Sequence, residues 1–233
     1  SRLPELCGAL RGVGRPEAAR LLAAGAWRWM SSQLQGWTTT VRNEVRKPQL
    51  EMLSSPLVRQ LEAADDKLRD EITGALREYE DNILECLMPA LRLADARRAT
   101  GGGLDIVAQD CAQRLRTIIA RPLRDEDDWS IEWTGCGCGI CDTLGTFLSS
   151  RSRRTFTWPL AKDGRRHVHT KIDLAGLPVR HHTRRQGRPY TLELTKTNEL
   201  FTRATNARNR AETDLEWLTS TWVTHRRERK AAK

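Results

Sequence analysis

The sequence predicts a mainly α-helical protein with a smaller α+β part: a helical bundle or repeat-like array over residues 1–122, then a metal-stabilised α+β module over residues 123–233. Apolar residues recur at three- and four-residue steps through the first 120 residues, as they do in amphipathic helices. Three short alternating runs beyond residue 150 are typical of strands, and three cysteines crowd between them and the helices. With 233 residues, of which 39% are hydrophobic, the chain is long enough for two small domains.

The first half predicts helices separated by proline, glycine and hydroxyl residues. We expect them over 3–13, from Pro16 to about 34, briefly through Val45, from a Ser54–Ser55 cap to about Leu87, and over 104–119. Pro48 and Pro89 are expected to interrupt or kink helices, and residues 99–103 to form a linker. The 1–122 segment holds no paired carboxylates, Ser–His pair or phosphate-binding glycine motif. A scaffold or docking role is therefore expected for it.

The second half predicts alternating helices and strands. A helix follows Cys141, a strand covers 155–160, and a helix over Lys162–Leu174 presents His167 and His169. Strands over 177–183 and 190–196 are joined around Gln186–Gly187 as a hairpin. A polar helix from about 198 to 222 closes the module, and a basic, mobile tail is expected over 225–233.

The cysteines form the run C-x-C-x2-C at Cys136, Cys138 and Cys141. Thiols this crowded do not readily bridge one another, because a disulfide needs its two Cβ atoms about 4 Å apart in a particular torsion. They suit a shared Zn²⁺, which takes four tetrahedral sulfur or nitrogen ligands. We expect the glycines at 135, 137 and 139 to adopt positive φ in the loop. A redox pair or inert thiols are the alternatives, but a redox motif normally opens a helix inside a βαβ unit, which the upstream sequence does not predict.

The fourth ligand is expected from the histidines, all five of which follow the cysteines. His167 and His169 would point about 200° apart on one helix, so only one of them can join the cysteines. His181 is a third candidate, because it shares a strand face with Leu177 and Val179. His182 and His225 are expected to face solvent.

A metal would decide whether so small a module folds. Zinc binding contributes about 10–16 kcal/mol in small folds, whereas a whole domain is stable by only about 5–15 kcal/mol. Four protein ligands leave no position for water, so we expect a structural Zn²⁺ rather than a hydrolytic one.

Positive charge is concentrated at the metal-binding end. Residues 151–233 hold 20 Lys or Arg against 8 Asp or Glu, a net charge of +12, whereas residues 1–150 have a net charge of −3. A field of one sign favours an anionic partner, most often DNA or RNA. Nine arginines are the candidate phosphate contacts: Arg151, Arg153, Arg154, Arg165, Arg166, Arg180, Arg184, Arg185 and Arg188.

The remaining cysteines indicate a reducing compartment. Cys7, Cys86 and Cys111 are scattered over helical patterns and are expected to be reduced core residues. No run of 18 apolar residues and no signal pattern occurs, so we expect an intracellular protein, cytoplasmic or in the nucleoid or nucleus, without a membrane partner.

Several positions together resemble a known family. They are the C-x-C-x2-C run, Leu144, Phe147–Leu148, Lys162, Arg165, His167, Arg185, Gly187, Pro189, Leu192 and Lys196. Over about residues 130–220 they are similar to the C-terminal region of large bacterial and fungal proteins labelled Fe(II)/2-oxoglutarate oxygenases. The resemblance implies that the three cysteines and His167 are the metal ligands.

The same resemblance implies that the catalytic domain lies elsewhere. Such oxygenases hold iron with two histidines and a carboxylate, the first pair written H-x-D, and no H-x-D occurs in this sequence. We therefore expect a non-catalytic zinc-binding accessory region that recruits nucleic acid or another acidic partner for a catalytic domain of the same parent chain. The alternatives are a part of the oxygenase that contributes to catalysis and a purely structural protein-interaction module.

Overall fold

The computed structural model describes residues 2–40, 42–99 and 102–231. The chain divides into two compact units. The helical unit comprises residues 1–120 and 210–233, and the α+β unit comprises residues 121–209. The predicted fold class, mainly α with a smaller α+β part, is confirmed.

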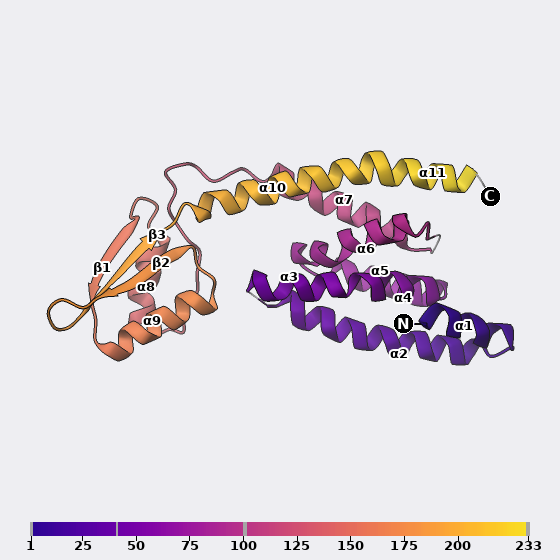
Figure 1. Ribbon diagram of the computed structural model, residues 1–233, viewed down its shortest axis with the longest axis horizontal. Coiled ribbons are helices and arrows are strands. Elements are labelled where there is room, and N and C mark those ends of the chain that lie inside the picture. The colour runs from indigo at the N-terminus through magenta and orange to yellow at the C-terminus, as the bar shows by residue number, and fades with distance from the viewer. Residues whose placement is uncertain (1, 41, 100–101, 232–233) are drawn as a thin grey trace. The chain divides into compact units, whose positions relative to one another are not determined.

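In the residues that the structure describes, the helical unit contains α1 to α7 before the α+β unit and the C-terminal helices after it (Figure 1). The first group is α1 (Leu3–Gly12), α2 (Pro16–Thr38), α3 (Asn43–Met52), α4 (Ser54–Ala63), α5 (Asp66–Arg77), a 3-10 turn (Asp81–Ile83), α6 (Leu84–Ala96) and α7 (Leu104–Ala120). The last group is the end of α10 (Glu199–Trp217), a π-helical turn (Leu218–Trp222) and α11 (Val223–Ala231).

Two prolines lie inside helices rather than at their ends. Pro48 lies in α3 and Pro89 in α6, so Pro48 does not interrupt its helix as expected and Pro89 is not a helix boundary. An interior proline costs a helix about 3 kcal/mol. In α6 that cost is offset because its neighbours Cys86, Leu87, Met88, Ala90 and Leu91 are all buried.

The predicted long helix from residue 54 to about 87 is instead three helices. It breaks after Ala64, whose backbone is extended, and restarts at Asp65, whose carboxylate accepts a hydrogen bond from the Leu68 amide at 2.8 Å. An aspartate N-cap satisfies an amide that the helix itself cannot. The apolar stripe continues across the break because Leu61, Leu68 and Ile72 all belong to one core.

The C-terminal helices belong to the helical unit, not to the metal-binding module as expected. Ala211, Leu218 and Trp222 join its core, and Arg226 pairs with Asp105 at 2.6 Å. His225 Nδ1 likewise lies 2.9 Å from Asp95. The described part of the expected mobile tail, residues 225–231, therefore belongs to an ordered, ion-paired helix, and residues 232–233 lie outside the described ranges.

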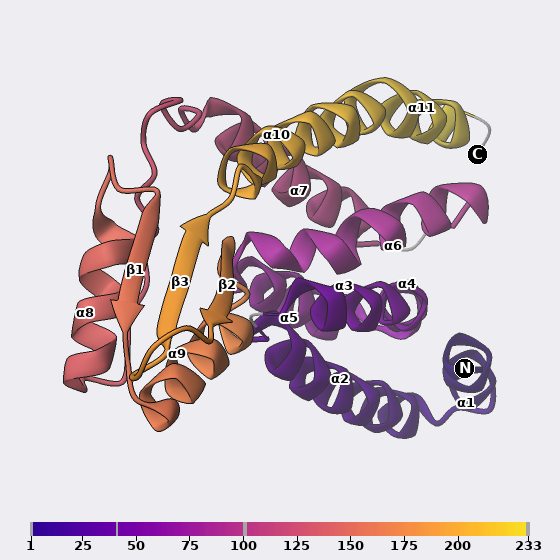
Figure 2. The ribbon, with the colours of Figure 1, turned by 60° about the vertical axis from the view of Figure 1, so that its left-hand side comes forward.

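The α+β unit is a three-stranded antiparallel sheet with two helices (Figure 2). Its elements are α8 (Gly139–Ser149), β1 (Thr155–Pro159), α9 (Lys162–Leu174), β2 (Val179–Arg184), β3 (Thr191–Lys196) and the start of α10. The strand order is β1–β3–β2, so the hairpin strand β3 lies in the centre. Phe156 and His181 both stand opposite Leu194.

The inner face of this sheet packs on α8 and α9. Leu192 and Leu194 of β3 share a core with Leu144, Phe147 and Leu148 of α8 and with Val168 and Ile172 of α9. Because strand side chains alternate, Val179, His181 and Thr183 face inward with them. The outer face carries Arg180, His182, Arg184 and Glu193.

Within the described ranges, no helix is both long and apolar enough to cross a membrane.

Candidate metal centre

Four potential ligands converge from three neighbouring segments of the α+β unit. Cys136 lies in the loop before α8, Cys138 is the N-cap residue of α8, and Cys141 lies in its first turn. His167 extends from α9, which packs beside α8. Their ligand atoms all lie within 4.8 Å of one another, and they form the one such group of three or more in the part of the chain that the structure describes.

The separations match a tetrahedral zinc site. Cys136 Sγ lies 3.5 Å from both Cys138 Sγ and Cys141 Sγ. His167 Nε2 lies 3.7, 3.5 and 3.2 Å from the sulfurs of Cys136, Cys138 and Cys141. A zinc ion with Zn–S bonds of about 2.3 Å and Zn–N bonds of about 2.0 Å places sulfurs about 3.8 Å apart and sulfur and nitrogen about 3.5 Å apart. The sulfurs are too far apart for a disulfide, which needs about 2.05 Å.

The three loop glycines differ in whether a side chain could replace their hydrogen atom. The expected positive φ occurs only at Gly137, where φ is 79°. At Gly135 a Cβ atom would lie 2.5 Å from Cys141 Cβ and 3.2 Å from its sulfur. At Gly139 a Cβ atom would meet nothing within 4 Å. Gly135 is therefore required by close approach, and Gly137 by backbone conformation.

The loop favours a thiolate before any metal binds. The Cys138 amide donates to the Cys136 sulfur, and with the neighbouring thiols and His167 it lowers the pKa of Cys136 to about 6. Burial raises the pKa of Cys141. A cysteine binds zinc as the thiolate. Of Cys136 and Cys141, it is Cys136 that loses its proton at the lower pH and is a thiolate at neutral pH.

The other histidines lie away from this cluster. His169 and His181 face each other with their Nδ1 atoms 2.5 Å apart. Burial, followed by the neighbouring His181, lowers the pKa of His169. His182 is exposed and lies 2.9 Å from Glu193. Of the three candidates for the fourth ligand, the structure thus brings His167 to the cysteines.

The nine candidate arginines fall into three groups according to what they contact. Arg151 pairs with Asp125 and Asp128, Arg184 pairs with Glu193, and Arg165 donates to the Leu160 carbonyl. Arg153 and Arg154 lie over the rings of Phe156 and Trp129, at 4.4 and 4.6 Å. The rest are exposed and have no acidic partner within the described ranges: Arg166, Arg180, Arg185 and Arg188.

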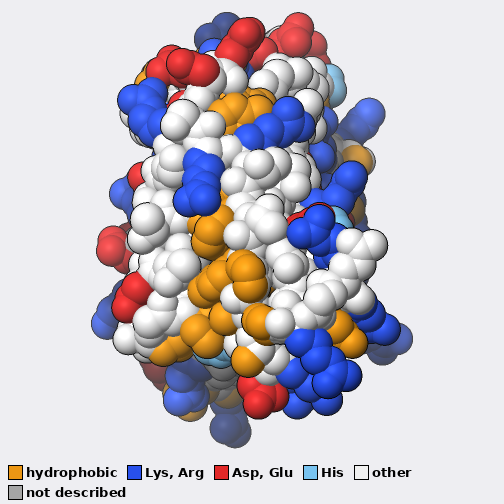
Figure 3. Space-filling view, turned by 90° about the vertical axis from the view of Figure 1, so that its left-hand side faces the viewer, with side chains coloured by type: hydrophobic (Ala, Val, Ile, Leu, Met, Phe, Trp, Pro, Cys, Tyr) orange, Lys and Arg blue, Asp and Glu red, His pale blue; other side chains and the backbone are white. Residues whose placement is uncertain are grey.

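The basic charge is spread more widely than the sequence suggested. The α+β unit holds 16 Lys or Arg against 10 Asp or Glu, a net charge of +6. It includes residues 121–150, with a net charge of −4, and leaves residues 210–233, with a net charge of +2, to the helical unit. In the view of Figure 3, Lys and Arg side chains lie in several separate groups with an apolar strip between them.

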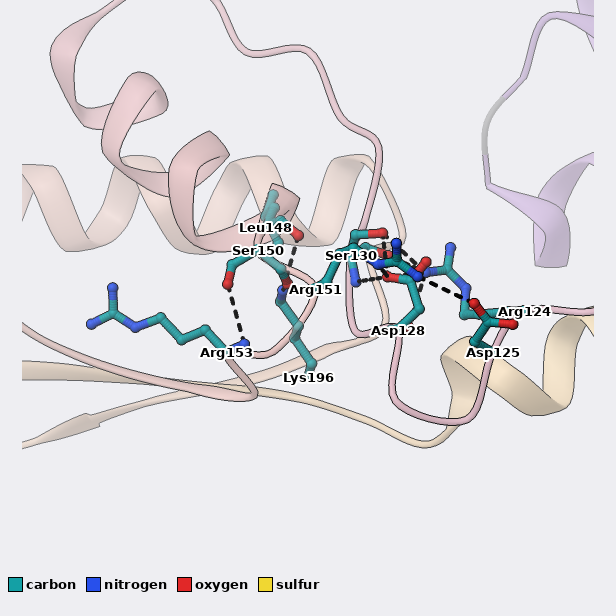
Figure 4. A network of polar contacts seen from close by, with 9 residues as sticks. All are labelled: Arg124, Asp125, Asp128, Ser130, Leu148, Ser150, Arg151, Arg153 and Lys196. Atoms are coloured by element: carbon teal, nitrogen blue, oxygen red, sulfur yellow. Dashed lines mark hydrogen bonds and ion pairs between the residues drawn. The ribbon is translucent and has the colours of Figure 1, made fainter.

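Lys196 is a buried charge that the sequence analysis missed as a site residue. Its side chain is fully buried, and Nζ donates to the carbonyls of Leu148 at 2.9 Å and Ser150 at 2.8 Å, where α8 ends (Figure 4). Burial lowers its pKa to about 8. The available signal was strand alternation, which places Lys196 on the same inward face as Leu192 and Leu194.

A pocket of about 580 Å³ lies on the α+β unit beside the start of α10. Trp129 and Phe201 meet in it edge to face, with ring centroids 4.9 Å apart. Arg154 also lines it and donates to Asn198 at 3.5 Å. The guanidinium carbon of Arg154 lies 4.6 Å from the centroid of the Trp129 ring.

Comparison with protein-family models, with curated proteins and with solved structures finds no match to this chain.

Proposed function

We propose that the α+β unit is a structural zinc-binding module. The observation that carries the proposal is the arrangement of three cysteine sulfurs and one histidine nitrogen at tetrahedral separations. Four protein ligands complete the coordination of zinc, so the ion would join the loop at 136–138, α8 and α9 rather than activate water. Free thiolates persist in a reducing compartment, where we place the protein.

Cobalt substitution tests the ligands. Co²⁺ bound to three thiolates is expected to give intense sulfur-to-cobalt absorption in the near ultraviolet and tetrahedral bands in the visible. These bands should be lost in Cys141→Ser and weakened in His167→Gln, whereas Cys7→Ser, whose thiol is buried in the helical unit, should retain them. Spectra that are unchanged in Cys141→Ser would refute the assignment.

We further propose that the module binds nucleic acid through contacts between its arginines and the phosphate backbone of the nucleic acid. Support comes from its net positive charge and from exposed arginines on its helix, sheet and hairpin: Arg166, Arg180, Arg185 and Arg188. Arginines without acidic partners are available for phosphate oxygens, whereas Arg151 and Arg184 are partly neutralised by their ion pairs. The arrangement favours sequence-independent contacts.

Salt dependence of binding tests this second part. For mixed-sequence DNA and RNA, affinity should fall steeply between about 50 and 200 mM salt. Arg180→Ala and Arg185→Ala should each weaken binding uniformly across sequences and reduce the salt slope by about 1. Arg184→Ala, which removes an arginine paired with Glu193, is the matched control. A flat salt response would reject a nucleic-acid partner.

A further inference from the structure

A second pair of imidazoles lies on the opposite side of α9 from the cysteine cluster. His169 follows His167 by two residues, so the two side chains point about 200° apart around the helix. His169 faces the sheet, where His181 of β2 points toward it. The two ring centroids are 4.7 Å apart, and both side chains are partly buried.

The outer nitrogens of both rings are held in place by other side chains. His181 Nε2 lies 3.2 Å from the Asp173 carboxylate, which accepts hydrogen bonds only, so Nε2 carries the proton. The neutral ring then has its lone pair on Nδ1. His169 Nε2 lies 3.3 Å from the Thr183 hydroxyl, which can accept its proton in the same way.

The inner nitrogens point at each other, and both have lone pairs available when the Thr183 hydroxyl accepts the proton of His169 Nε2. The two Nδ1 atoms are 2.5 Å apart, and two lone pairs at that distance require a shared proton or a cation between them. A metal-binding histidine characteristically donates its other ring N–H to a carboxylate or another oxygen acceptor, which fixes the ring. His181 and Asp173 have this relation, and the Thr183 hydroxyl occupies the corresponding place behind His169.

We propose that His169 and His181 form a second metal site, for a divalent cation of the zinc, nickel or copper class, bound through the two Nδ1 atoms. Imidazole is a preferred ligand of these cations. Two nitrogens bound to one tetrahedral zinc ion are about 3.3 Å apart, so the rings need to separate by less than 1 Å. Such a move is within the reach of small side-chain rotations, because Asp173 is exposed and His181 is not fully enclosed.

This site is independent of the zinc module proposed above and differs from it chemically. It offers two protein ligands instead of four, which leaves coordination positions for water or an added ligand. We therefore expect weaker, exchangeable binding. An ion held here would tie α9 directly to β2, whereas the cysteine cluster ties α9 to α8.

Zinc titration of the full chain tests the second site. Protein carrying one zinc ion after dialysis is titrated with further Zn²⁺ in a calorimeter, and bound metal is measured by elemental analysis. We expect one additional ion per chain. His181→Gln should abolish it, and Asp173→Asn should weaken it about 10- to 100-fold. His182→Gln, which changes the neighbouring outward-facing histidine, should leave it unchanged.

The outcome is separable from that of the cysteine cluster. Cobalt–thiolate absorption, which reports on the cluster alone, should persist in His181→Gln and so also show that the unit has folded. Binding of no second ion by the unaltered chain would overturn the proposal. A second ion that survives both His181→Gln and Asp173→Asn would do the same.

Discussion

Gly135 has no room for a side chain because the Cys141 side chain occupies the space. An added Cβ atom would lie 2.5 Å from Cys141 Cβ, closer than non-bonded carbons approach. We expect Gly135→Ala to displace Cys141 and to weaken zinc binding by at least about tenfold, which corresponds to about 1.4 kcal/mol. Competition with a chromophoric chelator measures this affinity.

Gly139→Ala is the matched control, since a Cβ atom there meets nothing within 4 Å and Gly139 is the first residue of α8. Alanine should be neutral or mildly stabilising at a helical position. Equal losses of zinc affinity in the two variants would contradict the close-approach explanation for Gly135.

Lys196 holds the end of α8 against β3. Lys196→Met fills similar volume beside the Phe147 ring but leaves the Leu148 and Ser150 carbonyls without their donor. An unsatisfied buried polar group costs about 1–3 kcal/mol, partly offset here because the buried ammonium is no longer desolvated. We expect net destabilisation of the α+β unit by about 1–3 kcal/mol in urea unfolding.

The same substitution should have a characteristic pH dependence. The pKa of Lys196 is lowered from 10.5 to about 8 in the folded protein, so between these pH values the unfolded chain binds more protons. The unaltered protein therefore gains stability from this group as pH rises through that window. The stability difference between Lys196→Met and the unaltered chain should grow from pH 8 to 10.5. A constant difference would show that the lysine does not titrate there.

The residues of the two histidine- and cysteine-containing sites differed in whether the sequence alone could assign them to a site. The spacing of Cys136, Cys138 and Cys141 was enough to predict a shared site, because so short a loop keeps the three sulfurs together. His167 could not be chosen over His169 from spacing, since both lie on one helix and only the position of α8 decides which side meets the cysteines. The histidine pair needed the register of β2 against β3, which brings His181 to the inward face.

At the scale of elements, α6 and α7 each bury a thiol, and this makes the helical unit sensitive to alkali. Burial raises the pKa of Cys86 to about 12 and raises that of Cys111 as well, from an ordinary value of 9.0. A group whose pKa is higher in the folded than in the unfolded state contributes its full stabilisation at pH values below its unfolded pKa. That contribution is lost as the pH rises toward the pKa of the folded state. We expect the urea midpoint of this unit to fall above pH 9.

Replacing Cys111 by alanine should flatten this alkaline decline while lowering stability at pH 7, because a small cavity is left. Cys7→Ala is the control, because burial raises the pKa of the Cys7 thiol less than that of Cys111. If Cys111→Ala retains the full decline, another group is responsible.

Element boundaries were predictable where one local signal dominates. The helix over Lys162–Leu174 has the predicted ends, because Pro159 stops the preceding strand and Gly176, with φ of 54°, follows the helix. Residues 54–96 were not predictable in this way. The Asp65 cap is a local signal, since its carboxylate accepts from the amide three residues on, but the unbroken apolar periodicity concealed it. The proline at 89 stays inside a helix because its neighbours are buried by tertiary contacts, which the periodicity does not reveal.

At the scale of the whole molecule, the α+β unit interrupts the helical unit in sequence. Composition placed the first boundary near residue 122, two residues from the Ala120 end of the helical unit. It did not place the second, because α10 is one continuous helix across residues 209 and 210. What distinguishes its two halves is the core that each contacts: Leu200 packs with the sheet core and Ala211 with the helical core.

Removal of metal should therefore unfold one unit and leave the other. The two cores share no residue, and zinc is worth about 10–16 kcal/mol to a small fold. Unfolding residues 121–209 leaves a long loop between α7 and the second half of α10, and closing a loop of this length costs only about 4 kcal/mol. The helical unit should withstand that cost.

Hydrogen exchange measured peptide by peptide, with and without a strong zinc chelator, tests this expectation. Protection should be lost over 121–209 and kept in α2, α4 and α6, with the change falling inside α10 between Leu200 and Ala211. Added zinc should restore it, which excludes damage by the chelator. Protection lost from both units together would mean that they fold as one cooperative body, and protection kept in both would mean that the cysteine cluster holds no ion on which folding depends.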